Sequence, residues 1–358
     1  MPKVRNFDVL IVYNGASATS ASITVKTNSV PFPLHSKNAS CNLAYAYFLE
    51  SCAQRGLKAA FTTSTDIIGA GTCKSYWSYQ NKQWRKSHGA CYSATIFDKF
   101  SPKSIENKIL YGLLFSSPSI KPFNDPKLRK VFSDKQKTYN SFLNHAIPTI
   151  SLLGDTLAQM NQACDQLSST MVAHVGSKDF STDIIMKDRY GAGGNHVYKF
   201  GAGQSKEMHA ITALNPTISF VLQPFASSDL PTDIRLIYLG GKIIESYIRV
   251  AKANDFRCNE HQGGTLTYLK IEDIPRNILA KAQNINAQLN NHHSLYSLDF
   301  MVSNAGNPYL LEGNIGPGLD WNLSVKKEER NAKKFIRRIV KEIGYRTSQS
   351  TPPRPQIV

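Results

Sequence analysis

The sequence predicts a mixed α/β fold, with a small N-terminal α/β domain followed by a larger strand-rich domain. Three observations support this prediction. The chain opens with a strand–helix–strand pattern, continues from about 183 to 314 mainly as strands and hairpins, and closes with an amphipathic helix. With 358 residues, of which 41% are apolar and 19% charged, it can form two or three packed units with sizeable cores.

The opening unit follows from hydrophobic patterning. Residues 8–13 (DVLIVY) form a β-branched apolar run that predicts a buried strand, and residues 57–63 (LKAAFTT) predict a second one. Between them, apolar residues recur at helical spacing after Asn42, which we expect to cap that helix. SATIFD at 93–98 predicts a further strand. We expect these elements to belong to an N-terminal α/β domain over residues 1–130.

Helical patterns also mark the middle and the end of the chain. Apolar residues recur at helical spacing from Ser133 until Pro148 stops the run. An amphipathic helix closes the fold, with Gly344 as its expected C-cap. Its apolar stripe consists of Ala332, Phe335, Ile336, Ile339, Val340 and Ile343. The tail from 345 to 358 has little to bury, so we expect it to be disordered.

The charge balance of the chain is strongly basic. It has 42 Lys and Arg residues against 26 Asp and Glu residues, which gives a net charge of +16 and a pI near 9.5. Such a field favours polyanionic partners such as nucleotides, acidic peptides or nucleic acid, without selecting among them. A basic composition is more often a general property than a binding site, so nucleic acid is not the partner that we expect.

Cysteine usage and hydropathy indicate the compartment. Six cysteines are scattered without the spacing of a metal site, which is typical of reduced, mostly buried thiols in a cytosolic protein. The apolar run near the N-terminus is too short for a signal peptide, and no apolar stretch approaches the ~18 residues that span a membrane. We therefore expect a soluble, cytoplasmic protein without membrane contact. The sequence does not indicate an oligomeric state.

An acidic hairpin at 297–314 (SLDFMVSNAGNPYLLEGN) is the first candidate for chemistry. If a two-residue turn lies at 305–306, Asp299 lies directly opposite Glu312, and Asn314 follows on the same face. Two adjacent carboxylates repel each other, and Mg²⁺ takes oxygen ligands that it usually shares with phosphate. The arrangement therefore predicts a magnesium site.

Two alternatives remain for this hairpin. Pro308 could force a longer loop and a different register. The acids could also lie on an exposed polar edge, although Met301, Leu310 and Leu311 make the hairpin largely apolar. A buried pair of acids needs a partner, which favours the metal.

A glycine-rich turn provides the second candidate. Residues 183–200 (DIIMKDRYGAGGNHVYKF) predict a strand, a turn and a second strand, with Lys187 just before Gly191, Gly193 and Gly194. Such a loop can place backbone N–H groups and one cation against a polyphosphate. A plain hairpin explains the pattern equally well, and the GxxxxGK[ST] phosphate loop is absent.

Arginines in the strand-rich region are the third candidate. A hairpin that turns at 240–241 brings Arg235 and Arg249 into one region, and Arg257 follows shortly after. Asp233 and Asn259 lie nearby in the sequence. Each arginine alone would more often be a solvated surface charge. Together with an acidic metal site, they suggest the electrostatic clamp that phosphoryl transfer needs.

Over roughly residues 131–343 the chain resembles the ATP-grasp superfamily, in particular the branch of RimK and glutathione-synthetase-like carboxylate–amine ligases. The segments that carry the resemblance are SDKQKT (133–138), IIMKDRYGAGG (184–194), VLQPF (221–225), DIR (233–235), RVAKANDFRCNEHQGG (249–264), LDF (298–300) and LEGNIGPGL (311–319). The resemblance implies a two-lobed ATP-grasp domain, with a small lid lobe over 131–222 and a large lobe over 223–344. Residues 1–130 would form the α/β domain that precedes the grasp.

The resemblance also implies a nucleotide site. Lys135 and Lys187 would contact ATP phosphates, and Arg257 would reach them as well. The stretch from Gln223 to Phe225 would be the hinge whose backbone meets adenine, and Asp233 would lie at the nucleotide. Pro224, within that hinge, stands where the family usually has an acidic residue.

The family's catalytic and metal positions carry over in the same way. Two Mg²⁺ ions, or Mn²⁺ in their place, would be held by Asp299, Glu312 and Asn314. Arg249 and Asn259 would face the transferred phosphoryl group or the acyl phosphate, with Arg257 beside them.

The implied activity is ATP-dependent formation of an amide bond through an acyl phosphate. The expected substrates are amino acids or short peptides, and a protein end to which glutamate-like residues are added is a further candidate acceptor. A phosphotransferase is a smaller alternative. A non-catalytic nucleotide-binding regulatory protein is the alternative from another class, although a pure binder would not need the whole set of charged residues.

Overall fold

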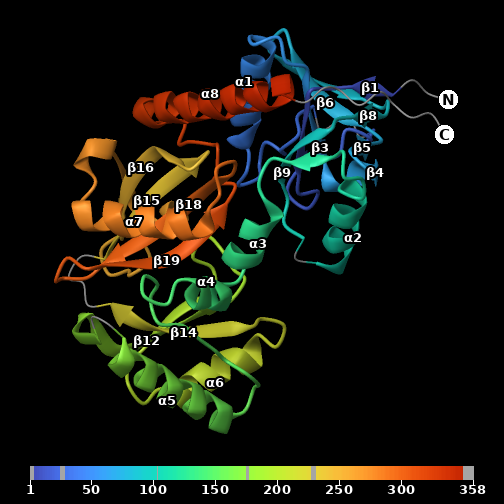
Figure 1. The fold of residues 1–358 in the computed structure, drawn as a ribbon. Coiled ribbons are helices and arrows are strands. Elements are labelled where there is room, and N and C mark those ends of the chain that lie inside the picture. Colours follow the sequence, from blue (N-terminus) through green and yellow to red (C-terminus); the bar gives the residue numbers. More distant parts are fainter. Residues whose placement is uncertain (1–3, 25–28, 103, 175–176, 227–230, 350–358) are drawn as a thin grey trace. The chain divides into compact units, whose positions relative to one another are not determined.

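The computed structural model describes residues 4–24, 29–102, 104–174, 177–226 and 231–349. The chain forms two compact units, one of Met1–Asn124 with Gly318–Val358 and one of Asp125–Pro317 (Figure 1). Both units combine β-sheets with helices, so the predicted mixed α/β fold is confirmed. Within the described part of the chain, no helix has the length and apolar character to cross a membrane.

The first unit contains a six-stranded sheet in the order β10-β9-β2-β3-β6-β7 and a smaller sheet in the order β1-β8-β5-β4. The strands are β1 (Arg5–Asn6), β2 (Val9–Tyr13), β3 (Ala59–Thr63), β4 (Ile67–Gly69), β5 (Thr72–Cys73), β6 (Tyr76–Gln80), β7 (Gln83–Ser87), β8 (Cys91–Tyr92), β9 (Thr95–Lys99) and β10 (Lys121–Pro122). The helices are α1 (Cys41–Ala53), α2 (Ile105–Leu114) and α8 (Lys326–Gln349). Strand β2 runs parallel to β3 on one side and to β9 on the other. The predicted strand–helix–strand opening is therefore confirmed.

Helix α1 begins at Cys41, two residues earlier than the predicted cap at Asn42 allows. Ser40 is the residue before the helix, and Asn42 lies within the first turn. The Asn42 amide instead accepts from the backbone N–H of Phe32 at 3.0 Å and donates to the Phe32 carbonyl at 2.7 Å. Asn42 therefore fixes the preceding loop against the helix and does not cap it.

Helix α8 lies beside α1 and buries the predicted apolar stripe (Figure 1). It does not end at Gly344, as predicted, but continues to Gln349. Arg346 stabilises this extra turn because it pairs with Glu342 at 2.9 Å and donates to the Phe123 carbonyl at 2.6 Å. Residues 345–349 are thus helical rather than disordered, and the rest of the predicted tail lies outside the described residues.

The second unit contains two further sheets. The four-stranded sheet has the order β11-β14-β12-β13, and the five-stranded sheet has the order β17-β16-β15-β18-β19. The strands are β11 (Ile150–Ser151), β12 (Phe180–Asp188), β13 (Val197–Phe200), β14 (Phe220–Ala226), β15 (Thr232–Leu239), β16 (Lys242–Val250), β17 (Thr265–Leu269), β18 (Leu295–Val302) and β19 (Pro308–Ile315). The helices are α3 (Pro126–Phe132), α4 (Lys135–Ser141), α5 (Leu157–Ala173), α6 (Ser205–Leu214) and α7 (Arg276–Leu289).

Each sheet of the second unit has its own core. Helices α5 and α6 lie on the same side of the four-stranded sheet (Figure 1), where Met160, Leu167 and Met208 pack against its strands. Helix α7 packs Ile278 and Ile285 against the five-stranded sheet. The helical pattern predicted from Ser133 to Pro148 is shorter in the structure, because α4 ends at Ser141.

Gly313, in β19, lies against the ring of Phe132, and a Cβ at this position would collide with that ring. We expect Gly313→Ala to lower the free energy of unfolding by about 1–3 kcal/mol, as overpacking of a core does. Urea denaturation would measure the change. Gly201→Ala is the matched control in the same unit, since its Cβ would meet only the Gln204 side chain at 3.4 Å. Equal midpoints for the two variants would show that Phe132 moves aside freely.

Candidate active site

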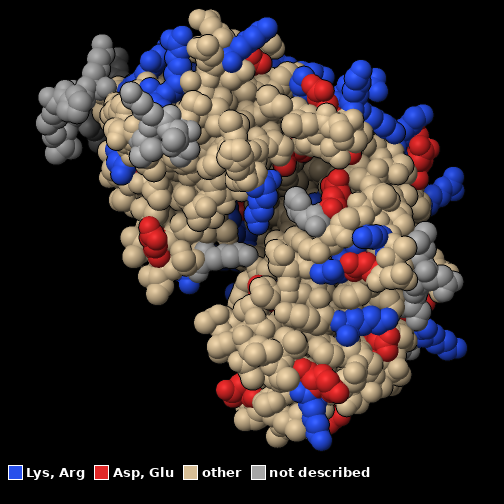
Figure 2. All heavy atoms as spheres, turned by 180° about the vertical axis from the view of Figure 1, so that it is seen from behind, with Lys and Arg blue, Asp and Glu red and all other residues tan. Residues whose placement is uncertain are grey.

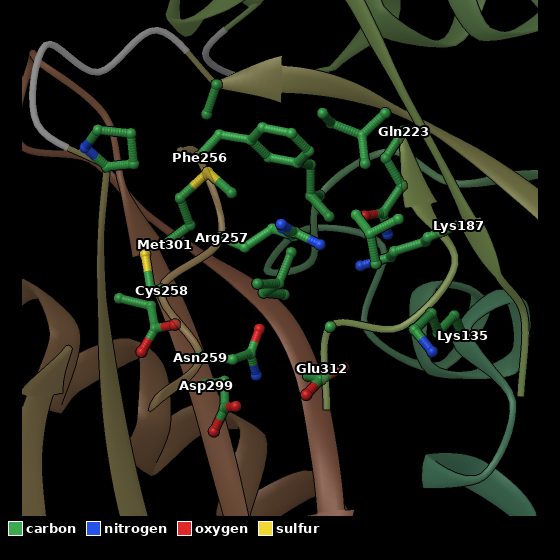
Figure 3. Close-up of a pocket in the computed structure, with 18 of the residues that line it drawn as sticks. Lys135, Lys187, Gln223, Phe256, Arg257, Cys258, Asn259, Asp299, Met301 and Glu312 are labelled. Carbon is green, nitrogen blue, oxygen red and sulfur yellow. The ribbon is translucent and has the colours of Figure 1, made fainter. Parts of the chain in front are cut away.

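One pocket of the second unit lies between its two sheets and brings the predicted site residues together (Figure 3). The pocket and its open mouth together enclose about 940 Å³ of space that protein atoms leave free. The predicted residues that line it are Lys135, Lys187, Gln223, Phe225, Asp233, Arg249, Arg257, Asn259, Asp299 and Glu312. Asn314 does not line the pocket but lies two residues beyond Glu312 on the same strand.

The glycine-rich turn forms one wall of the pocket. Strands β12 and β13 form the predicted hairpin, with Lys187 opposite Val197. Gly193 and Gly194 both have positive φ values, +73° and +74°. A Cβ on Gly194 would lie 2.9 Å from the Asn259 side-chain oxygen, so the turn can approach Asn259 only because this residue is glycine.

Lys187 is the buried cation of this wall, with 6% of its surface exposed. Burial, together with the nearby charge of Lys135, lowers the pKa of Lys187 to about 7. The carboxylates of Glu312 and Asp299 act in the opposite direction but do not restore the ordinary value. Lys187 is thus poised to gain a proton when a polyanion enters the pocket.

Lys135, at the start of α4, holds the turn in place. Its ammonium donates to the carbonyl oxygens of Asp188, at 2.9 Å, and Gly191, at 2.6 Å. Asp134 beside it pairs with Arg189 through two hydrogen bonds of 2.8 Å. The Lys135 ammonium therefore binds the backbone of the turn while it lines the pocket.

Strand β14 supplies the expected hinge. Gln223 is buried and donates to the Thr149 hydroxyl at 2.8 Å. The Phe225 ring is covered by the Lys199 ammonium, 3.8 Å from the ring centroid, and meets Phe256 edge-on. Pro224 lies opposite Ile184 of β12. On the other side of β14, the short β11 pairs only with Val221 and Leu222, so the missing N–H of Pro224 costs no hydrogen bond to β11.

Two ion pairs across neighbouring strands hold Asp233, Arg249 and Asp299 in the pocket lining, and the fourth member, Arg235, lies behind them. Arg235 grips Asp299 with two hydrogen bonds of 2.6 and 2.5 Å, and Arg249 grips Asp233 with two of 2.7 and 2.9 Å. Arg249 also reaches Asp299 at 3.0 Å, which joins the pairs. Burial alone would raise the pKa of Asp299, but the two guanidinium groups outweigh it and hold the pKa below its usual value.

A β-bulge sets the pair of Arg249 and Asp233. The hairpin of β15 and β16 turns at Gly240-Gly241, as predicted, and Leu239 lies opposite Lys242. Ile244 is then an extra residue on β16, so that Ile237 faces Glu245 and Asp233 faces Arg249. Without this bulge, Arg249 would point to the other face of the sheet.

A second bulge sets the acidic pair. The loop between β18 and β19 is longer than the predicted two-residue turn, with Val302 opposite Pro308 and Phe300 opposite Leu310. Leu311 is the extra residue, and beyond it Asp299 lies opposite Glu312, as predicted. The predicted pairing is therefore confirmed, whereas the predicted turn is wrong, because a longer loop and a bulge compensate for each other.

Glu312 differs from Asp299 in its surroundings. It is half-buried, and its carboxylate accepts from the Asn314 amide at 3.1 Å. Within the described ranges of the chain, no Lys, Arg or His forms an ion pair with Glu312. Two carboxylates and an amide oxygen on adjacent strands form a donor set of the kind that Mg²⁺ takes. The described residues contain no group of three or more His, Cys, Asp or Glu side chains that could hold a metal.

The segment after β16 closes the pocket from another side. Arg257 forms two side-chain hydrogen bonds with Asp255, of 3.1 and 2.9 Å, and remains partly exposed. Asn259 lies beside it, and Gln262 donates to the Gly193 carbonyl at 3.4 Å. Figure 3 shows Arg257 and Asn259 pointing into the space between Lys187 and Asp299.

The apolar walls of the pocket are the residues that the sequence did not indicate. They are Ile147, Ile185, Val197, Phe256, Met301 and Leu311. Two of them could have been predicted from strand alternation. Ile185 precedes Lys187 by two residues and Met301 follows Asp299 by two, so each lies on the same face of its strand as the site residue. The sequence placed Arg235 with the other arginines of the site. Its ion pair with Asp299 depends on the pairing of β15 with β18, which could not be predicted from the sequence.

Comparison with known proteins places this pocket in a family. Residues 133–339, more than half of the chain, match the sequence profile of the RimK-like ATP-grasp domain. A "Probable alpha-L-glutamate ligase" of Maridesulfovibrio salexigens is 33% identical over 102 residues, which cover 28% of this chain and 32% of that relative. The chain spans about a third to a half of the length of the curated relatives it matches.

Solved structures share the fold at low identity. D-alanyl-alanine synthetase A from Vibrio cholerae gives a TM-score of 0.59 at 12% identity, over 95% of this chain and 98% of its own. The ATP-grasp ligase PsnB, solved with a phosphomimetic variant of its minimal precursor, Mg and ADP, gives 0.56 at 11% identity, over 94% and 99%.

Proposed function

Because this chain belongs to the RimK-like ATP-grasp family, we propose that it is an ATP-dependent carboxylate–amine ligase. The observation that carries the proposal is the pocket in which a buried lysine, two arginines and the Asp299–Glu312 pair converge. Such a site offers charge for a polyphosphate on one side and oxygen ligands for a cation on the other.

The nucleotide is proposed to bind between the two sheets. Lys187, Lys135 and Arg257 would meet its phosphates, and the backbone from Gln223 to Phe225 would meet its adenine. The apolar walls around Ile185 and Met301 would bury the base. Asp233 would act indirectly, by holding Arg249 toward the site through the observed ion pair.

The metal is proposed at Asp299, Glu312 and Asn314, as two Mg²⁺ ions or Mn²⁺ in their place. When bound, these cations would neutralise phosphate oxygens during transfer. Arg235 and Arg249 would keep Asp299 ionised and oriented, as their hydrogen bonds to it indicate. Arg249 and Asn259 would face the transferred phosphoryl group.

The reaction follows in two steps. A carboxylate oxygen of the substrate forms a bond to the γ-phosphorus of ATP as the bond from that phosphorus to the bridging oxygen breaks, which releases ADP. An amine then attacks the acyl carbon; a C–N bond forms, the C–O bond breaks, and phosphate leaves while the amine loses a proton. The glycine-rich turn would exclude water, which would otherwise hydrolyse the acyl phosphate.

The substrates are proposed to be amino acids or peptides, with a protein end as a further acceptor. Relatives named as glutamate ligases support this class. The lid lobe (131–222) and large lobe (223–344) remain our proposed functional division, although α8 lies in the unit of the N-terminal residues. We place the protein in the cytoplasm, where ATP is present and free thiols persist, because all six cysteines are free.

A screen for ADP release tests the proposal. We expect ADP to form with ATP and Mg²⁺ only when a carboxylate donor and an amine acceptor are both present, and the screen would cover amino acids and short peptides singly and in pairs. A product mass equal to the two substrates less one water would identify the amide. Tight ATP binding without turnover in any pair would contradict the proposal and favour a regulatory protein.

A further inference from the structure

The basic charge of the chain is concentrated in one of its two units. The first unit has 24 of the 42 Lys and Arg residues but only 9 of the 26 Asp and Glu residues, so its net charge is +15. The second unit has 18 basic and 17 acidic residues, a net charge of +1. Because the pocket lies wholly in the second unit, nucleotide binding does not account for the excess.

Helix α8 arranges part of this charge in a line. Five exposed cations follow one another at spacings of three and four residues: Lys327, Arg330, Lys334, Arg337 and Lys341. Residues at these spacings lie on one face of a helix, so they form a basic stripe about 21 Å long. Figure 2 shows Lys and Arg side chains projecting along the upper border of the face that it displays.

The acids of α8 do not neutralise this stripe. Glu329 pairs with Lys333 and Glu342 with Arg346, and neither of these cations belongs to the stripe. Glu328 accepts from the backbone N–H of Asn322 at 2.9 Å. Within the described part of the chain, the stripe residues form no ion pair. Like charges so close together repel, which an anionic partner would relieve.

The surroundings of the stripe favour neither nucleic acid nor an anionic membrane as its partner. The major groove of a nucleic-acid duplex, about 12 Å wide, admits a free α-helix, but α8 is packed along its whole apolar face and cannot enter a groove in that way. Single strands are bound through aromatic side chains on which bases stack, and on α8 only Tyr345, beyond the end of the stripe, is a large exposed aromatic residue. An anionic membrane would require an apolar helix face, but that face of α8 is buried.

An acidic polypeptide fits the stripe without these difficulties. Carboxylates on one face of an extended chain recur about every 6.7 Å, and those on one face of a helix recur about every 5 Å. Both lysine and arginine pair with carboxylates, and neither requires a stacked base. We propose that the basic stripe of α8 is a docking surface for an acidic segment of a polypeptide. The proposal goes beyond the ligase function, because no residue of α8 lines the pocket.

Fluorescence anisotropy of labelled peptides tests this surface in the full-length protein. The probe is a peptide in which Glu alternates with Gly, and the comparison peptide has Gln in place of each Glu. We expect the protein to bind the first and not the second, and the affinity to fall as salt is raised. The triple variant Arg330→Glu/Lys334→Glu/Lys341→Glu should bind at least about tenfold more weakly, since each exposed pair contributes modestly and reversal adds repulsion.

A matched control separates the stripe from the general basic field. Lys58→Glu/Lys74→Glu/Arg85→Glu changes three exposed residues of the same unit and alters the net charge by the same amount. It should bind the peptide nearly as wild type does. Equal loss in both triple variants would overturn the proposal, because it would show that only net charge matters.

Two further measurements test binding of nucleic acid and the independence of the stripe from the ligase site. Single-stranded or duplex DNA of the same total charge should bind more weakly than the acidic peptide; tighter binding would assign the stripe to nucleic acid instead. Glu312→Ala should bind the peptide as wild type does in the absence of ATP. A docking failure and a failure of the ligase proposal would thus be seen in different measurements.

Discussion

Glu312→Ala is expected to lower the rate of ADP formation by about 10³-fold or more, while the protein remains folded. Glu312 forms no ion pair with a Lys, Arg or His side chain among the described residues, whereas Asp299 pairs with two arginines, so a metal would be a natural counter-charge for Glu312. Removal of the carboxylate would remove both a ligand and the negative charge that attracts the ion. A coupled assay of ADP release at increasing Mg²⁺ concentration would measure the loss.

The neighbouring acid would give a less informative variant. Asp299 is fully buried between Arg235 and Arg249, and its removal would leave the Arg235 guanidinium without its carboxylate, whereas Arg249 would keep only Asp233. Such a change typically costs about 3–5 kcal/mol of stability, so lost activity could reflect unfolding. Glu272→Ala, at an exposed residue of the same unit, is the matched control for Glu312→Ala. Unchanged turnover in Glu312→Ala would contradict the metal assignment.

The acidic pair shows how far local reasoning extends. Strand alternation could be predicted, because the side-chain period of a strand is two, but the pairing of Asp299 with Glu312 was correct only because two deviations from the expected hairpin compensate. The loop could not be predicted, since Pro308 begins the strand and Leu311 is an added residue. The loop is one residue longer than predicted, and the bulge at Leu311 adds one residue to β19. The two differences compensate, so Asp299 still lies opposite Glu312.

The partner of Asp299 depended on contacts distant in sequence. Arg235 faces Asp299 only because β15 lies beside β18, and no pattern within either strand specifies that neighbour. The position of Arg249 could not be predicted either, because Arg249 lies opposite Asp233 only as a result of the bulge at Ile244. The sequence thus indicated which residue types would be used, and the sheet order decided which of them meet.

Helix ends were the least predictable part of the fold. Gly344 predicted a C-cap, but the helix continues beyond it. Arg346 stabilises the extra turn, because it pairs with Glu342 one turn earlier and donates to the Phe123 carbonyl. Phe123 is far away in sequence, and its contribution appears only once the first unit is folded. Tertiary contacts of this kind override a glycine's local cost of about 1 kcal/mol.

Lys187 provides the second large effect, on the pH dependence of ATP binding. In the free protein, burial holds the pKa of Lys187 at about 7, so the side chain is neutral above that pH. A phosphate nearby favours the charged form and raises the pKa, so ATP binding takes up a proton between pH 7 and the pKa of the complex. The ATP affinity should therefore fall as pH rises through this window, by up to about tenfold per pH unit.

Calorimetry of ATP binding in buffers of different ionisation enthalpy would count this proton. At pH 8 we expect an uptake approaching one proton in the wild-type protein. Lys187→Met should abolish the uptake and weaken ATP binding by about 10²-fold, because the buried cation is lost. Lys187→Arg should bind without proton uptake, since arginine stays protonated. Lys206→Met, at an exposed residue of α6, is the matched control and should behave as wild type. Equal uptake in wild type and Lys187→Met would assign the proton to another group and would remove Lys187 from the phosphate site.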